Sequence, residues 1–126
     1  MALEALAKLG NYFHVYDFRV KPGTGDEFIR LFNEFDYSDA NPMHKSSAQV
    51  KDGVLCRDTE DADHFYLIGE WRDIDVHRAI RKQMADNPRP EFIKLVEGGG
   101  FVPTYAEIVT ETPQDILDKA QAGGAE

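Results

Sequence analysis

Runs of alternating and helically spaced apolar residues predict six core elements between residues 11 and 110. Four segments are rich in aromatic and β-branched residues and predict strands, at 11–20, 47–57, 64–72 and 101–110. Two segments between them repeat apolar residues at helical spacing. These positions are Phe28, Leu31, Phe32 and Phe35 in the first helix and Val76, Ile80 and Met84 in the second. The predicted order is therefore β-α-β-β-α-β.

Turn-forming residues separate these elements. The acidic turn 58–63 joins the second and third strands into a hairpin, and Asp52-Gly53 predicts a bulge in the second strand. Asp73 is expected to cap the second helix. Shorter helices are expected at 91–96 and at 113–120, and disorder at 122–126.

This order predicts an α+β, ferredoxin-like fold. Right-handed crossovers give a four-stranded antiparallel sheet with both helices on one face. The first strand has apolar residues on both of its sides, for example Tyr16 and Phe18 on one and Phe13 and Val15 on the other. Because the helices cover only one face, a second copy of the chain is expected to cover the other, giving a homodimer.

We expect a single domain over residues 1–126, with its core at about 11–111 and a C-terminal tail at 112–126. Leu3, Leu6 and Leu9 recur at helical spacing in an N-terminal arm of residues 1–10. This arm either lies on a partner subunit or frays.

Composition and charge narrow the function classes. The chain has 14 Lys and Arg against 23 Asp and Glu, a formal charge of −9, which disfavours nucleic acid and membrane-surface partners. Its one cysteine, Cys56, cannot form an internal disulfide and is expected to be a buried small apolar residue. The first residues carry Glu4 and no basic leader, and no apolar run reaches membrane-spanning length. A cytoplasmic location is expected. No two histidines lie at i, i+4 and no paired Cys/His motif occurs, so no metal site is expected.

Three short motifs, in this order on this strand and helix pattern, resemble the antibiotic biosynthesis monooxygenase family. They are Lys21-Pro22-Gly23, Cys56-Arg57-Asp58 and Glu70-Trp71-Arg72-Asp73. The resemblance covers about residues 12–110 and implies a dimeric α+β barrel. It also implies oxidation of a small planar phenol- or quinol-type aromatic by O2 with no cofactor. The same superfamily includes haem-degrading enzymes and isomerases, and a non-catalytic ligand-binding dimer is a further alternative.

The candidate substrate cleft surrounds Trp71, the only tryptophan. It shares a strand face with Phe65, Leu67 and Gly69, so its ring is expected to form a wall for a planar substrate with its N–H free for a ligand oxygen. The alternative is a core residue that pins the sheet to the helices. The expected substrate-binding residues are Trp71, Phe65, Leu67, Phe32, Tyr16 and Arg72.

His77 and His14 are the candidate general bases, since an imidazole accepts a proton near neutral pH. The family relatives have a tyrosine at about the position of His77, and the alternative for His77 is a helix-surface residue. His14 is otherwise a histidine at a dimer seam. Arg89 or Arg72 is expected to steady the substrate oxyanion, unless both are surface residues. A haem-degrading enzyme would instead use His77 and Asn11.

The sequence departs from the family pattern at two positions. Leu67 stands where the relatives have an asparagine, and Glu91 stands where they have an arginine, with Arg89 the nearest match. The polar contacts of the family's substrate are therefore not carried over to this chain.

Overall fold

The computed structural model describes residues 3–122, with side chains through Lys119, and it confirms the predicted order of elements. The strands are β1 (Tyr12–Arg19), β2 (Gln49–Arg57), β3 (His64–Trp71) and β4 (Pro103–Glu107). The α-helices are α1 (Gly25–Asp36), α2 (Ile74–Met84) and α3 (Gln114–Ala122). Short segments of 3₁₀ helix cover Met43–Lys45, Glu91–Leu95 and Glu97–Gly99.

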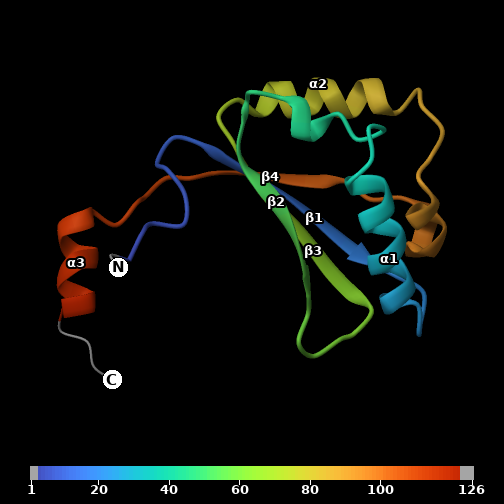
Figure 1. Cartoon of the computed structure of the whole chain (residues 1–126), viewed down its shortest axis with the longest axis horizontal. Coiled ribbons are helices and arrows are strands. Elements are labelled where there is room, and N and C mark those ends of the chain that lie inside the picture. The colour runs from blue at the N-terminus through green and yellow to red at the C-terminus, as the bar shows by residue number, and fades with distance from the viewer. Residues whose placement is uncertain (1–2, 123–126) are drawn as a thin grey trace.

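The four strands form one antiparallel sheet in the order β2-β3-β1-β4. Helices α1 and α2 lie on the same side of this sheet (Figure 1). The strand order and the one-sided helices give the ferredoxin-like α+β fold that the sequence predicts. The predicted bulge is present, because the β2–β3 register shifts between Lys51 and Val54. Asp73 caps α2 as expected, its side chain accepting from the backbone N–H of Asp75.

The core is a cluster of aromatic rings between the sheet and α1. Phe18 and Phe65 project from paired positions on β1 and β3, and Phe28 and Phe32 meet them from α1. Phe28 and Phe65 are fully buried, with ring centroids 4.9 Å apart. Each such ring contributes roughly 1.5–3 kcal/mol on burial, so this cluster holds the helix against the sheet.

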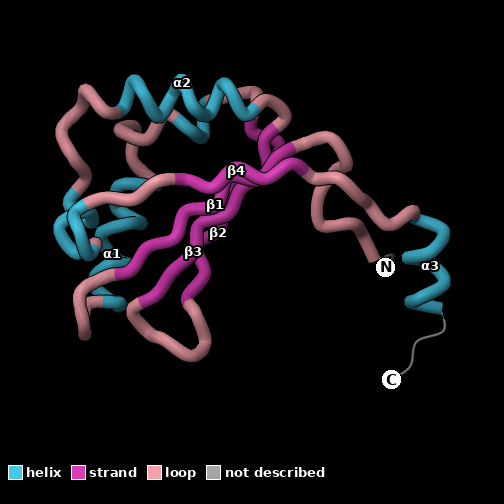
Figure 2. Tube along the Cα trace, turned by 180° about the vertical axis from the view of Figure 1, so that it is seen from behind, coloured by secondary structure: helices cyan, strands magenta, loops and turns pink. Residues whose placement is uncertain are grey.

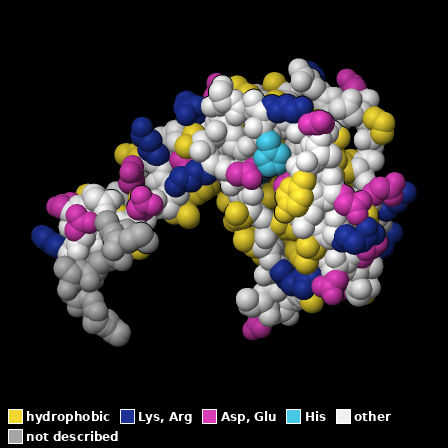
Figure 3. Space-filling view, in the orientation of Figure 1, with side chains coloured by type: hydrophobic (Ala, Val, Ile, Leu, Met, Phe, Trp, Pro, Cys, Tyr) yellow, Lys and Arg dark blue, Asp and Glu magenta, His cyan; other side chains and the backbone are white. Residues whose placement is uncertain are grey.

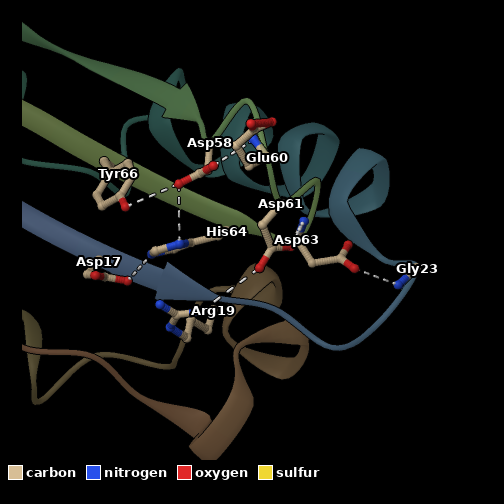
Figure 4. Close-up of polar contacts among 9 residues, drawn as sticks. All are labelled: Asp17, Arg19, Gly23, Asp58, Glu60, Asp61, Asp63, His64 and Tyr66. Atoms are coloured by element: carbon tan, nitrogen blue, oxygen red, sulfur yellow. Dashed lines mark hydrogen bonds and ion pairs between the residues drawn. The ribbon is translucent and has the colours of Figure 1, made fainter.

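The other face of the sheet, here called the open face, carries none of the helices in the described part of the chain (Figure 2). It is apolar at its centre, where Val54 of β2 pairs with Ile68 of β3, which pairs with Val15 of β1. Cys56 lies on this face and is exposed, so the expectation of a buried cysteine was wrong. One end of the face is polar, and there Nε2 of the buried His64 lies 2.7 Å from a carboxylate oxygen of Asp17 (Figure 4).

The two ends of the described chain form a joint arm beside the sheet (Figure 1). The N–H of Gly10 donates to the carbonyl of Ile108, and the N–H of Ile108 donates to the carbonyl of Asn11. Residues 3–10 are not helical, although their leucines have helical spacing. The expected disorder falls on residues 122–126, of which Ala122 ends α3 and the rest lie outside the described residues. Within residues 3–122 no helix has the length and apolar character needed to cross a membrane.

Candidate functional site

A cavity of about 300 Å³ lies between the sheet and the helices. Aromatic and aliphatic side chains from β1, β3, α1, the end of α2 and the segment 85–101 form most of its wall. A few polar groups interrupt this apolar wall, which is the usual composition of a small-molecule site. The lining includes His14, Tyr16, Leu67, His77, Arg81 and Phe101.

His14 and Trp71 form a hydrogen-bonded pair at one end of the cavity. The indole N–H of Trp71 donates to Nδ1 of His14 over 2.8 Å. His14 pairs with Gly69 across the sheet, and a Cβ at Gly69 would lie only 2.7 Å from Cε1 of the imidazole. The ring of His14 therefore occupies the gap that the glycine leaves. Trp71 is fully buried and lies behind His14, and its N–H, expected to be free for a ligand, is already used.

His77 is fully buried and faces the cavity side of α2. Its Nδ1 lies 2.8 Å from the hydroxyl of Tyr105 and its Nε2 lies 3.4 Å from that of Tyr16. Its ring stacks on that of His14, with centroids 4.5 Å apart. The interpretation of His77 as a helix-surface residue was wrong, because α2 buries Ile74 and His77 while Val76 stays half-buried.

Burial changes the ionisation of both histidines. It lowers the pKa of His14 to about 4. Burial, followed by the proximity of His14 and Arg81, lowers the pKa of His77 to about 3. Burial also raises the pKa of Tyr16, against the opposing effect of Arg81. At neutral pH His14, His77 and Tyr16 are therefore all uncharged.

Arg81 supplies a positive charge that the sequence analysis missed. Its guanidinium donates to the carbonyl of Phe101 over 2.6 Å and to the hydroxyl of Tyr16 over 3.4 Å. It also lies over both aromatic rings, 5.0 Å from the centroid of Phe101 and 5.4 Å from that of Tyr16. Among the described residues no carboxylate pairs with it. Arg81 follows His77 by four residues, so both lie on the same face of α2. This spacing could have predicted from the sequence that Arg81 lies beside His77.

The other predicted site residues divide into two groups. Tyr16, Phe32, Leu67 and Arg89 line the cavity with His14 and His77, Arg89 from an exposed position where it donates to the carbonyl of Gly99. Phe65 is in the aromatic core, and Arg72 is exposed and donates to the carbonyl of Ser47. Neither of these two, nor Trp71, lines the cavity.

A second group that the sequence analysis missed lies in the cavity lining between α1 and β2. Nε2 of His44 lies 3.1 Å from Oδ1 of Asp36 in α1, and its Nδ1 lies 2.8 Å from Oδ1 of Asp52 in β2. His44 belongs to the loop 37–48, and all three residues line the cavity. Carboxylate oxygens only accept hydrogen bonds, so this geometry requires a proton on each ring nitrogen. Partial burial lowers the pKa of His44, but the two carboxylates raise it more, and the pKa lies above its ordinary value.

No family model matches the chain, and no curated protein matches its sequence. Solved structures share its fold. A Bordetella bronchiseptica protein named for the antibiotic biosynthesis monooxygenases is 21% identical, has a TM-score of 0.57, and aligns over 80% of this chain and 99% of that one. SnoaB of Streptomyces nogalater, a cofactor-independent oxygenase solved as a mutant, is 18% identical with a TM-score of 0.57 over 82% and 98% of the two chains.

A dimeric ferredoxin-like protein from an uncultured marine organism is 11% identical, with a TM-score of 0.57 over 82% of this chain and 92% of that one. The resemblance to antibiotic biosynthesis monooxygenases is therefore confirmed at the level of the fold. Similarities of this size concern the fold and leave the chemistry of the site to its own residues.

Proposed function

We propose that this chain is a cofactor-independent oxygenase that oxidises a small planar phenol- or quinol-type aromatic with O2. The observation that carries the proposal is the apolar cavity on whose wall His14, Tyr16 and Arg81 converge, the last with no carboxylate partner among residues 3–119. The shared fold with SnoaB, itself described as a cofactor-independent oxygenase, adds support. Aromatic walls suit a flat ligand, and the polar groups suit its oxygen.

Stabilisation of the substrate anion is the main task of the site in this proposal. Ground-state O2 reacts with organic molecules slowly unless they are electron-rich, so the phenol must ionise before it gives an electron to O2. A guanidinium in an apolar cavity lowers the pKa of a phenol beside it, because an opposite charge favours the ionised form. Arg81 is placed for this role, whereas Arg72 lies away from the cavity. Arg89 lies at an exposed part of the lining.

Proton removal by His77 or His14 is a weaker contribution. His14 has its Nδ1 lone pair engaged by Trp71. Protonating His77, whose pKa is about 3, costs roughly 5 kcal/mol at pH 7, which makes it a poor base. We propose instead that His77 orients the hydroxyl of Tyr16, and that the substrate proton leaves to water at the open part of the cavity.

The haem-degrading alternative is not favoured by the geometry. Both ring nitrogens of His77 lie beside tyrosine hydroxyls, so neither is available as an axial ligand. The side chain of Asn11 donates to Glu70, which pairs with Phe13 on the open face. His77 and Asn11 therefore lie on opposite sides of the sheet and cannot face one haem group together.

Oxygen consumption with simple probe substrates tests the proposal. Chelator-treated protein is mixed with 1,4-dihydroxynaphthalene or anthrone, and O2 uptake is followed with an electrode. We expect uptake above the uncatalysed rate, reduced about 10²- to 10³-fold in Arg81→Gln and little changed in the matched control Arg72→Gln. Conversion that persists under argon would instead indicate an isomerase. Saturable binding without conversion would indicate a ligand-binding protein.

We also propose that the functional unit is a homodimer. The open face is apolar at its centre, and in a single chain none of the helices within residues 3–122 covers it. The dimeric ferredoxin-like protein with the same fold adds support. The partners in this proposal are the aromatic substrate, O2 and a second copy of the chain.

A further inference from the structure

We propose that Trp71 is a positioning residue that fixes His14 as a neutral imidazole protonated only on Nε2. The cavity then presents a hydrogen-bond donor at this point, and it selects ligands that offer an acceptor oxygen there. The tautomer follows from the geometry alone. The consequence for the ligand rests on the proposed function.

The direction of one hydrogen bond determines the tautomer. An indole N–H is a donor only, so Nδ1 of His14 must keep its lone pair to accept over 2.8 Å. A neutral imidazole carries one ring proton, which must then be on Nε2. A doubly protonated ring would direct one N–H at another, so the same contact opposes protonation. Burial acts in the same direction by lowering the pKa of His14.

The ring of His14 is also fixed in orientation. Its Cε1 and Nδ1 occupy the space over Gly69, 2.7 and 3.2 Å from where a Cβ would be. The ring of His77 stacks on it at 4.5 Å with an interplanar angle of 22°. A flip of the imidazole about its Cβ–Cγ bond would replace Nδ1 with a carbon and lose the bond to Trp71. The positions of Gly69, His77 and Trp71 therefore act together on one ring.

Nε2 of His14 is not sealed off by the side chains around it. Within residues 3–119, Nε2 has no hydrogen-bond partner, and the one fully sealed side-chain polar atom without a partner is Oε1 of Glu70. His14 lines the cavity, so its free N–H is reached from that side. Arg81 adds a second donor nearby, at the hydroxyl of Tyr16, whose ring lies 5.2 Å from that of His14.

Two donors beside one cavity favour an anionic acceptor. A phenolate, enolate or carboxylate on a planar aromatic ring accepts from both donors, and hydrogen bonds to a charged oxygen are stronger than those to an un-ionised hydroxyl. Sites built to hydrogen-bond one group discriminate strongly against ligands that lack it. We therefore expect the cavity to bind the ionised form of its substrate, which is the form that the proposed oxidation requires.

Nitrogen NMR of the histidine-labelled protein tests the tautomer directly. Long-range proton–nitrogen spectra distinguish a protonated from an unprotonated ring nitrogen, and loss of signals in His14→Gln assigns the residue. At pH 7 we expect only Nε2 of His14 to be protonated. In Trp71→Phe we expect a mixture of tautomers and a pKa raised by about one unit or more. A protonated Nδ1 in the natural chain, or an unchanged tautomer and pKa in the variant, would overturn the inference.

A second substitution separates the hydrogen bond from packing. Trp71 is the only tryptophan, so it can be replaced throughout by benzothienylalanine, which keeps the bicyclic ring and lacks the N–H. We expect this protein to fold and to release the His14 tautomer as Trp71→Phe does. It also decides the question if Trp71→Phe does not fold.

Binding of 2-naphthoate and naphthalene tests the consequence for the ligand. We expect the naphthoate affinity to fall about tenfold or more in the benzothienylalanine protein, with naphthalene affinity unchanged. An equal loss for both ligands would refute the donor role of His14. A protein with the expected tautomer and no O2 chemistry would refute the proposed oxygenase and leave the assignment of Trp71 intact.

Discussion

The fold lowers the pKa of two residues most clearly, His14 and His77. Both imidazoles are buried among aromatic rings, and each lies close to the other. Because burial disfavours the charged form, both stay neutral over the range in which a free histidine titrates. The free energy of unfolding is therefore expected to depend on pH in the acid range.

Acid should destabilise the protein through His14. Its folded pKa of about 4 is below the unfolded value of 6.5, so between these pH values the unfolded chain binds more protons. Stability is therefore complete above pH 6.5 and decreases as the pH falls toward 4, by at most about 3 kcal/mol for this group. Urea unfolding at several pH values should show a shallower acid loss in His14→Gln. Parallel curves for the two proteins would contradict this assignment.

Gly69→Ala should displace the imidazole of His14. The new Cβ would lie 2.7 Å from Cε1 of that ring and 3.3 Å from the backbone of Gly53, so the site has no room for it. We expect a loss of about 1–3 kcal/mol in the free energy of unfolding, together with changed fluorescence of Trp71 as its hydrogen bond breaks. Gly100→Ala is the matched control, since its Cβ meets nothing within 4 Å. Equal behaviour of the two variants would rule out the close contact.

At the scale of elements, the sequence predicted α2 but not which of its faces is buried. Its apolar stripe of Val76, Ile80 and Met84 is only half-buried, while Ile74 and His77 are buried. In the sequence, His77 and Arg81 are typical of the solvent-facing side of a helix. Only the tertiary fold shows which strands lie opposite them. His14 and Tyr105, which meet His77, come from β1 and β4, so this information is in the tertiary fold.

The remaining elements were predicted where local pattern determines them. The aromatic stripe of α1 and the hairpin of β2 and β3 depend on spacing and turn residues nearby in the chain. Strand β4 is shorter than its predicted range 101–110, because Phe101 turns into the core, 4.6 Å from the ring of Phe18. The contact between Trp71 and His14 could not be predicted, since it depends on strand register.

The loop 37–48 should loosen as the pH rises. Its attachment is His44, which donates to Asp36 of α1 and Asp52 of β2 as an imidazolium. Since its folded pKa is raised above 6.5, this contribution is complete below pH 6.5 and is lost as the pH rises through the folded pKa. Hydrogen exchange of residues 37–48, corrected for the intrinsic rate, should increase over that range.

His44→Gln should make the exchange of this loop high at every pH. His64→Gln is the control, because His64 pairs with Asp17 on the open face and does not contact the loop. Loop exchange that does not depend on pH in the natural chain would show that His44 does not hold it.

At the scale of the whole molecule, the chain has two unlike sides. The cavity lies on one side, between the sheet and the helices. The open face is the other side, and the terminal arm lies beside it (Figure 1). Hydrophobic side chains gather along the hollow between the arm and the body of the molecule (Figure 3). Leu6 and Leu9 of the arm are 79% and 52% exposed in a single chain. The expected contact of the arm with a partner subunit would bury these side chains, and it stays a prediction.

Val54→Glu should separate the proposed dimer without unfolding the chain. Val54 is 59% exposed in a single chain, so a charge there costs little, but the same charge would lie at the centre of an interface on the open face. Light scattering should give twice 14.3 kDa for the natural chain and 14.3 kDa for the variant. Val102→Glu is the matched control, since Val102 is 78% exposed and outside the sheet, and it should remain dimeric.

A stable dimer needs roughly 1,200 Å² or more of buried surface, and the open face is the apolar area on which that surface can form. A measured mass of 14.3 kDa for the natural chain would rule out the dimer. A dimer that tolerates Val54→Glu would place the interface elsewhere.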